Sequence, residues 1–444
     1  MPGAEPARDS IALWQQLQAT AAVLLAVRQG TSTTAALERV PPGLRPGVQA
    51  LAFQVLRSLG RAQALRQRLA SRPPPSEADA LLCTALALGW SDQTAPYEPF
   101  TLVNQTVEAA KRTPGTKAQA NFINACLRRF LREKSALVAA TDNDPLARWN
   151  HPGWWVARLK KDHPSRWESI LDTNNAQAPM TLRVNNLKSS RDAYLGQLRA
   201  ANIDATPSGA SGITLAKALP VQAIAGFVEG VVSVQDAAAQ LAAPLLLCGI
   251  DTTLPLRVLD ACAAPGGKTA HLLELARCDV LALDIDSQRC ERIRETLQRL
   301  GLGAQVLAAD AAEPSSWWDG RLFDAILLDA PCTASGIVRR HPDVPWLRRE
   351  SDIARLATVQ ARLLKALWPL LKPGGRLLYC TCSVFRAEGI DQVQTFLVHN
   401  TDASLLPSPG QLVPHFRANK EGVPDNSDDD HDGFYLALLE KHAT

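Results

Sequence analysis

The stretch from Leu256 to His271 constrains the fold of this chain more than any other feature of its sequence. An apolar run ends at Asp260, a turn of small residues follows with Gly266 and Gly267, and an amphipathic helix comes next. This order predicts a strand, a glycine turn and a helix. In a parallel sheet such a unit brings backbone N–H groups close to a nucleotide at the carboxyl edge.

Two better-known phosphate loops do not match this turn. Gly267-Lys268-Thr269 ends like a P-loop, but the first glycine of G-x-x-x-x-G-K-[ST] would fall on Cys262. The dinucleotide pattern G-x-G-x-x-G is also absent from the stretch. An acidic strand end before a tight turn suits a ligand with ribose and amine groups better than a polyphosphate. The alternative is a turn that only packs the helix on the strand.

The length and composition indicate a soluble protein of more than one domain. The chain has 444 residues, which is longer than the roughly 250 to 300 residues that one hydrophobic core usually serves. Of these residues 46% are hydrophobic and 20% are charged, as in soluble globular proteins. Nine scattered cysteines without a C-x-x-C pair argue against a disulfide framework and a structural zinc, so no metal site is predicted. The start resembles no secretory signal and no apolar run spans a bilayer, so we expect a cytoplasmic protein.

Positive charge is concentrated in the amino-terminal third of the chain. The first 150 residues carry six more basic than acidic residues, whereas the rest is slightly acidic. Basic side chains gather in two groups: Arg57, Arg61, Arg66, Arg68 and Arg72, then Lys111, Arg112, Arg128, Arg129 and Arg132. This third is therefore the natural part to face a polyanion, and a merely solvated basic face is the alternative.

Apolar spacing predicts helices throughout residues 11–70 and at 77–89, 101–112 and 117–135. Around 104–108 and 121–124 this region resembles the RNA-binding domain of the antitermination factor NusB, which favours RNA binding. Alternating residues and one helix between 180 and 234 predict a small α+β unit. The stretch 425–432, with Asp428, Asp429 and Asp430, is expected to be a solvated acidic loop.

From residue 256 onward, strands and helices alternate as in a doubly wound, Rossmann-like sheet. Strands are predicted at 256–260, 279–284, 304–308, 323–328 and 375–380, with a late strand at 434–439. Four aspartates stand at or just after strand ends: Asp260, Asp284, Asp310 and Asp329. An acidic residue after the second strand commonly holds ribose hydroxyls, and four in succession indicate a positively charged nucleoside.

Two thiols follow the fourth and fifth predicted strands. Cys332 lies in Asp-Ala-Pro-Cys-Thr-Ala-Ser-Gly, and Cys382 lies in Thr-Cys-Ser. If these strands are neighbours about 4.8 Å apart, both thiols share one pocket at the ligand edge. Buried, inert cysteine is the alternative. A thiolate that adds to C6 of a pyrimidine makes C5 nucleophilic, and a second group must then handle the C5 proton.

The three motifs together resemble the Nol1/Nop2/Sun family of S-adenosylmethionine-dependent RNA 5-methylcytosine methyltransferases. Arg339-Arg340-His341-Pro342-Asp343 and the helical amino-terminal region point to its bacterial small-subunit ribosomal RNA branch. The resemblance implies a methyl-donor loop of Cys262, Ala263, Ala264, Pro265, Gly266, Gly267 and Lys268. It implies further S-adenosylmethionine contacts from Asp284, Asp310 and Asp329.

The resemblance also assigns the two thiols. It makes Cys382 the nucleophile and Cys332 the residue that assists product release. DNA cytosine methyltransferases use a Pro-Cys nucleophile instead, so spacing alone would favour Cys332. Thr333 departs from the serine that is common in the family, but it keeps a hydroxyl.

Three domains are expected. They are a NusB-like helical domain at 1–140, linker helices with a small α+β subdomain at 145–240, and a methyltransferase domain at 241–444. The implied activity is C5 methylation of a cytosine in 16S ribosomal RNA by a monomer, on unassembled or partly assembled subunit RNA and away from membranes. A transfer RNA methyltransferase of the same family and a non-catalytic ribosome-assembly scaffold are the alternatives.

Overall fold

The computed structural model describes residues 11–414 and 430–442 and divides the chain into two compact units. The first unit comprises the residues up to Ala176 together with Val338–Arg348. The second comprises Gln177–Ile337 and the residues from Arg349 onward. Of the predicted acidic loop, Asp428 and Asp429 lie outside the described residues. The three domain ranges expected from the sequence stay a prediction.

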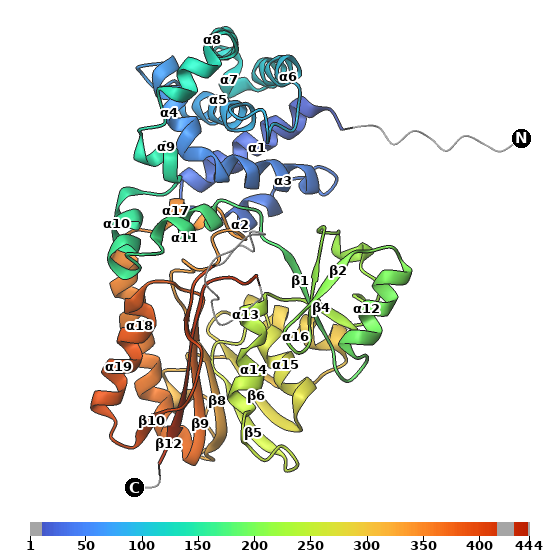
Figure 1. Cartoon of the computed structure of the whole chain (residues 1–444), viewed down its shortest axis with the longest axis vertical. Helices are drawn as coiled ribbons and strands as arrows, with labels where there is room; N and C mark the ends of the chain where they lie inside the picture. Colours follow the sequence, from blue (N-terminus) through green and yellow to red (C-terminus); the bar gives the residue numbers. More distant parts are fainter. Residues whose placement is uncertain (1–10, 415–429, 443–444) are drawn as a thin grey trace, which may run out of the picture. The chain divides into compact units, whose positions relative to one another are not determined.

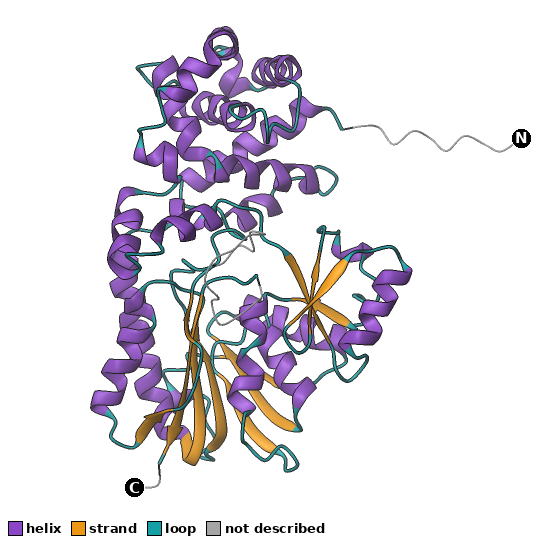
Figure 2. Cartoon of the chain, in the orientation of Figure 1, coloured by secondary structure: helices purple, strands orange, loops and turns teal. Residues whose placement is uncertain are grey.

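The first unit is built from helices, as the apolar spacing predicts (Figure 2). They are α1 (Leu13–Arg28), α2 (Thr33–Glu38), α3 (Arg45–Arg57), α4 (Leu59–Leu69), α5 (Ser76–Gly89), α6 (Pro99–Arg112), α7 (Pro114–Lys117), α8 (Ala120–Ala139), α9 (Pro145–Trp149), α10 (Gly153–Asp162) and α11 (Trp167–Asn174). Helix α5 is buried along almost its whole length and packs against α1, α4 and α6. No helix among the described residues is long and apolar enough to cross a membrane.

A segment from the carboxyl-terminal half of the sequence completes the first unit. Val338–Arg348 contains the short helix α17 (Val344–Leu347) and is grouped with the amino-terminal helices. Arg57 Nη2 donates to the carbonyl of Arg339 at 2.7 Å, and Thr33 N donates to Asp343 Oδ2 at 2.7 Å. The Arg-Arg-His-Pro-Asp stretch is therefore part of the packing of this unit.

Several arginines of the basic third are structural rather than exposed. Arg61 is buried and donates to Thr141 and Asp142, and Arg66 forms an ion pair with Asp79. Arg57 is half-buried, as its bond to Arg339 requires. Arg57, Arg61 and Arg66 therefore contribute to the packing of this unit rather than to an exposed basic surface. The basic residues of the two groups that remain exposed are Arg68, Arg72, Lys111, Arg112, Arg128, Arg129 and Arg132.

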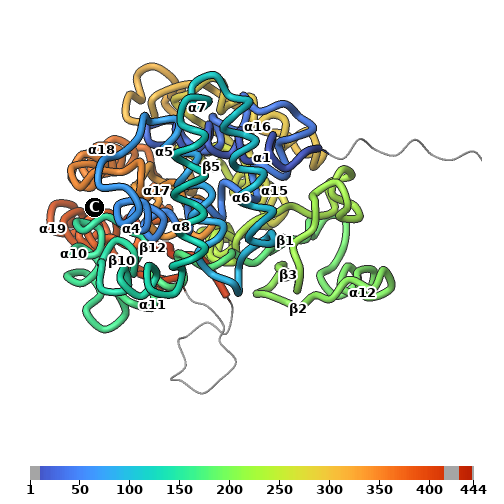
Figure 3. Tube along the Cα trace, turned by 90° about the horizontal axis from the view of Figure 1, so that it is seen from above, coloured from blue at the N-terminus to red at the C-terminus, as the bar shows by residue number. Residues whose placement is uncertain are grey.

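The second unit opens with a small antiparallel sheet of order β2-β3-β1-β4. Its strands are β1 (Met180–Val184), β2 (Ala205–Ser208), β3 (Gly212–Leu215) and β4 (Val232–Val234). Helix α12 (Arg191–Ala200) packs against β2 and β3 (Figure 3). The small α+β unit is present as predicted, with β2 as a strand that the sequence pattern did not show.

The larger sheet has the order β10-β12-β9-β8-β5-β6-β7 (Figure 1). Its strands are β5 (Leu256–Asp260), β6 (Cys278–Asp284), β7 (Gln305–Ala308), β8 (Phe323–Asp329), β9 (Leu371–Thr381), β10 (Ala403–Leu405), β11 (Gly410–Leu412) and β12 (Phe434–Lys441). Strands β5 to β9 run parallel, and β12 pairs antiparallel with β9. The six predicted strands are all present.

Helices cover both faces of this sheet (Figure 1). They are α13 (Ala237–Gln240), α14 (Ala242–Leu247), α15 (Gly267–Leu275), α16 (Ser287–Leu300), α18 (Ser351–Leu367) and α19 (Ile390–His399). Because successive strand residues point to opposite faces, Val258 packs in the core with α14 and α15, whereas Leu259 packs with α18 and α19. The predicted doubly wound fold class is confirmed.

Candidate functional site

The turn after β5 is shaped by one glycine. Gly266 has φ +96°, a conformation that side-chain-bearing residues avoid, and a Cβ there would lie 3.2 Å from the Cα of Ile293. The peptide bond between Ala264 and Pro265 is cis. Helix α15 begins at Gly267, so its first backbone N–H groups lie at the carboxyl end of β5.

The strand order brings the predicted aspartates to one edge. Asp284, Asp260 and Asp329 are the last residues of β6, β5 and β8, three neighbouring parallel strands. Asp310 follows the next strand, β7, by two residues. All four therefore stand at the carboxyl edge, where doubly wound folds bind their ligands.

Three of these carboxylates interact strongly. Burial raises the pKa of Asp260 to about 7, and the charges of Asp329 and Asp284 add to the rise, while a hydrogen bond from Thr269 opposes it. The thiol of Cys262 has a raised pKa for the same reasons, burial first and then these carboxylates. The three carboxylates therefore lie close enough for their charges to interact, and the charge of Lys268 at the same edge opposes the rise in the pKa of Asp260.

Lys268 connects the donor turn to the thiols. Its ammonium donates to Asp329 Oδ2 at 2.6 Å and lies 5.4 Å from the ring centre of Phe434. Burial opposes the charge of Lys268, but Asp329 and the thiols of Cys380 and Cys382 raise its pKa overall. Lys268 is therefore protonated and paired with Asp329.

The two predicted thiols lie in contact. Because β8 and β9 pair in parallel, the loops that follow them run side by side, and the Cys332 and Cys382 Sγ atoms are 3.4 Å apart. Backbone hydrogen bonds hold the loops together: Ala330 N donates to the carbonyl of Cys380, and Gly336 N to that of Cys382, each at 2.9 Å. The predicted sharing of one pocket by these cysteines agrees with this geometry.

The remaining predicted residues have specific partners. Asp310 receives hydrogen bonds from Ala312 N at 2.9 Å and from Arg362 at 2.8 Å. Asp284 is buried, accepts from Asp286 N at 3.1 Å and lies 3.3 Å from Arg289. Cys380 is fully buried in the core, and its Sγ lies 3.6 Å from Asp329 Oδ1.

A pair of buried polar residues near the thiols could not be predicted from the sequence. Glu388 and Gln360 are both fully buried, and both hydrogen-bond to the loop that carries Cys332. Neither belongs to a short motif with a known spacing. The only sequence signal was a polar residue within an otherwise apolar helical face, at Gln360 of α18.

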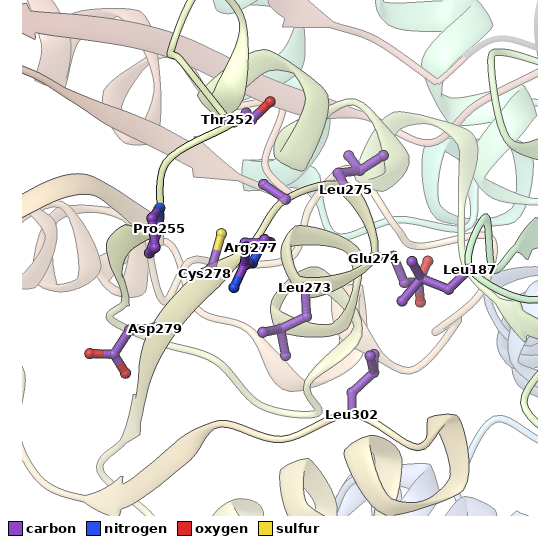
Figure 4. Close-up of a pocket in the computed structure, with 11 residues that line it drawn as sticks. Leu187, Thr252, Pro255, Leu273, Glu274, Leu275, Arg277, Cys278, Asp279 and Leu302 are labelled. Carbon is purple, nitrogen blue, oxygen red and sulfur yellow. The ribbon is translucent and has the colours of Figure 1, made fainter.

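A large hollow elsewhere in the second unit is a poor candidate for the site. It has a volume of about 670 Å³ and is lined by Pro255, Cys278, Asp279 and neighbouring residues (Figure 4). These residues lie at the amino ends of β5 and β6, whereas Asp260 and Asp284 end the same two strands. The hollow is therefore at the edge opposite the thiols.

Comparison with known proteins agrees with this geometry. Residues 252–440 match the model of the 16S rRNA methyltransferase RsmB/F. A ribosomal RNA small subunit methyltransferase B of Vibrio cholerae is 40% identical over 95% of this chain and 96% of its own length. The chain belongs to the RsmB/F family. Another relative of that name, from Pseudomonas putida, is 42% identical over 96% of this chain and 98% of its own.

Other parts of this RsmB/F member match as predicted. Residues 15–132 match the NusB family, and residues 151–222 match the ferredoxin-like domain of RsmF/B-like methyltransferases. The crystal structure of a methyltransferase homologue from Pyrococcus horikoshii is 26% identical, covers 67% of this chain and 98% of its own, and has a TM-score of 0.54. The structure of the protein PH0851, 24% identical, shares the fold with a TM-score of 0.73 over 96% of this chain and 99% of its own.

Proposed function

We propose that this chain transfers a methyl group from S-adenosylmethionine to C5 of a cytosine in 16S ribosomal RNA, through a covalent bond between Cys382 and the base. The observation that carries the proposal is the 3.4 Å contact of two thiols at the ligand edge of a methyltransferase sheet. Membership of the RsmB/F family and about 40% identity to small subunit methyltransferases B support the RNA substrate.

The donor residues suit S-adenosylmethionine, which when bound supplies a methyl group on a cationic sulfonium. The carboxylates of Asp260, Asp284 and Asp329, whose charges interact at this edge, complement this charge. Asp284 lies where nucleotide-binding folds hold a ribose. We assign the donor site to Cys262, Ala263, Ala264, Pro265, Gly266, Gly267 and Lys268, with Asp284, Asp310 and Asp329.

In the proposed reaction, the Cys382 thiolate forms a bond to C6 of the cytosine. The electron pair of the C5=C6 bond becomes available at C5, which accepts the methyl group. Lys268, held by Asp329 at 2.6 Å, places a cation at the same edge of the sheet.

Product release breaks the bond between Cys382 and C6 that formed in the first step. The C5 proton leaves, the C5=C6 bond re-forms, and the bond between C6 and the sulfur of Cys382 breaks. Cys332, in contact with that sulfur, gives its proton to the departing thiolate and takes the C5 proton in exchange. Both thiols then carry protons, so the proton that the methyl group replaced stays on the enzyme until solvent takes it.

The exposed basic residues of the first unit are the proposed RNA contacts. Arg128, Arg129 and Arg132 lie on the solvent side of α8, and Lys111 and Arg112 end the neighbouring helix α6. Glu133 and Glu108 pair with some of them, which leaves a net positive face. We assign this face to phosphate contacts, in a cytoplasmic monomer that acts on unassembled or partly assembled subunit RNA.

The function is tested by methyl transfer from labelled S-adenosylmethionine to three substrates: protein-free 16S ribosomal RNA, assembled small subunits and transfer RNA. We expect label in 16S RNA as 5-methylcytosine, with the protein-free RNA as the best substrate. Label in transfer RNA alone would instead support a transfer RNA enzyme. A chain that binds 16S RNA but transfers no label to any of the three would be a scaffold.

Replacement of Asp284 tests the donor site. Asp284→Ala should weaken S-adenosylmethionine binding by about 1 to 3 kcal/mol, or roughly 5- to 150-fold in Kd, because a carboxylate that accepts hydrogen bonds is lost. Asp279→Ala is the matched control, since Asp279 lies on the same strand at the opposite edge, beside the hollow of Figure 4. If calorimetry finds weaker S-adenosylmethionine binding in Asp279→Ala and unchanged binding in Asp284→Ala, the ligand binds at the amino edge of the sheet, which contradicts this proposal.

A further inference from the structure

Glu388 is a fully buried carboxylate next to the two thiols. It ends the short 3₁₀ turn Arg386–Glu388, which follows the Thr-Cys-Ser motif, and it has no exposed surface. A carboxylate in such a place costs several kcal/mol unless hydrogen bonds compensate it. The hydrogen bonds of Glu388 therefore identify the segments that it stabilises.

The side chain of Glu388 joins the loops that carry the two cysteines. Its Oε1 accepts from the backbone N of Thr333 at 2.8 Å, and its Oε2 accepts from the Thr333 hydroxyl. The same Oε2 accepts from the Ser383 hydroxyl at 2.6 Å. Thr333 directly follows Cys332 and Ser383 directly follows Cys382, so one carboxylate holds the neighbour of each thiol.

Other buried groups extend this link to the strand and to helix α18. The backbone carbonyl of Glu388 accepts from Tyr379 Oη at 2.8 Å and from Thr381 Oγ1 at 3.2 Å. Gln360 Nε2 donates to the carbonyl of Pro331 at 2.9 Å and lies 3.4 Å from Glu388 Oε1. The residues on both sides of each cysteine are thus tied to Glu388 directly or through Gln360.

The charge of Glu388 also distinguishes the thiols. Burial raises the pKa of Glu388, whereas the hydrogen bonds from Ser383, Thr333 and Gln360 oppose the rise and favour the charged form. Cys332 has a raised pKa because of its hydrogen bond with Cys382, its burial, and the charges of Cys382 and Glu388.

We propose that Glu388 is a positioning residue that fixes the two thiol-bearing loops against each other, so that Cys382 acts as the nucleophile and Cys332 as its partner in product release. The proposal deepens the proposed function and rests on it. With a proton held on Cys332, one thiol of the contacting pair adds to C6 and the other supplies the proton for release. Without the carboxylate, the pair loses both its spacing and this difference in charge.

Alkylation of Cys332 tests the charge effect without RNA or S-adenosylmethionine. Full chains that carry Cys382→Ala are treated with iodoacetamide across a pH series, and the Cys332 peptide is followed by mass spectrometry. Because a nearby anion opposes thiolate formation, Glu388→Gln should lower the pH of half-alkylation by about one unit. Glu388→Asp keeps the charge and should move it less. Glu291→Gln, on the exposed face of α16, should leave it unchanged.

The positioning effect is measured by methylation in chains that retain Cys382. Glu388→Gln should lower kcat about tenfold or more with little change in S-adenosylmethionine affinity, and Glu388→Asp should recover part of the loss. An unchanged alkylation midpoint together with an unchanged kcat would overturn the proposal. If Glu388→Gln does not fold, the chain with Cys382→Ala alone still tests the proposal. In that chain Glu388 is present, so Cys332 should be half-alkylated at a pH above the pKa of an ordinary thiol, about 8.5. Half-alkylation at or below that pH would contradict a Cys332 that Glu388 keeps protonated. If Glu388→Gln shifts the pH of half-alkylation of Cys332 but the unsubstituted chain methylates no RNA, the proposed function is refuted and the role of Glu388 is not.

Discussion

A chain with Cys382→Ser should lose methyl transfer almost completely. A serine hydroxyl is scarcely ionised near neutral pH and is a far weaker nucleophile than a thiol, so no bond should form to C6. Removal of the nucleophile from an enzyme that works through a covalent intermediate costs about 10⁴-fold or more in kcat. The measurement is label transfer to 16S RNA, together with denaturing gels for a protein–RNA adduct, which should not form.

The fold of this variant should be intact, because serine is close in size to cysteine and Cys382 is only partly buried. S-adenosylmethionine affinity by calorimetry is the control and should stay within a few-fold of the unsubstituted value. Cys248→Ser provides the matched comparison, since Cys248 is an exposed thiol outside the site, and it should keep full activity. Methylation by Cys382→Ser within tenfold of the unsubstituted chain would exclude Cys382 as the nucleophile.

The sequence predicted the sheet well because its strands are marked at both ends. Strands β5, β6 and β8 are mostly apolar runs that end on an aspartate. The bounds of β5 are those predicted, and those of β6 and β8 differ from the prediction by one residue. The carboxyl edge of such a sheet is fixed by chain direction alone. The aspartates at that edge could therefore be found without coordinates.

The contact between the thiols needed one assumption, that the fourth and fifth strands are neighbours. A sequence does not state strand order, and an insertion of about forty residues separates β8 from β9. The pairing of Leu327 with Leu378 in the structure supplies that order and brings Cys332 to Cys382. The family resemblance, not the spacing, decided which thiol to treat as the nucleophile.

Other features could not be predicted because they depend on long-range packing. Within the inserted region, Val338–Arg348 belongs to the helical unit through bonds to Arg57 and Thr33, some 280 to 310 residues earlier. The burial of Arg61 and Arg66 likewise depends on partners in other helices. Glu388 is one acidic residue in a short turn, and its role becomes visible only from its hydrogen bonds to the loops that carry Thr333 and Ser383.

The variant Cys332→Ala should give the opposite result to Cys382→Ser, namely a covalent complex that accumulates. Cys382 keeps its thiol, so it should still add to C6, and C5 should still accept the methyl group. The departing sulfur then lacks the proton that Cys332 holds 3.4 Å away, so the bond to C6 breaks slowly. A protein–RNA species stable in denaturing gels should build up, dependent on both RNA and S-adenosylmethionine.

Formation of this adduct in the different variants distinguishes the roles of the two thiols. The double variant Cys332→Ala with Cys382→Ser should form none, which shows that the trapped bond is the one to Cys382. An adduct in Cys382→Ala but not in Cys332→Ala would exchange the two assignments. If neither single variant forms an adduct and both still methylate RNA, covalent catalysis by these thiols is refuted, because each step of the scheme requires a sulfur that one of the variants has removed.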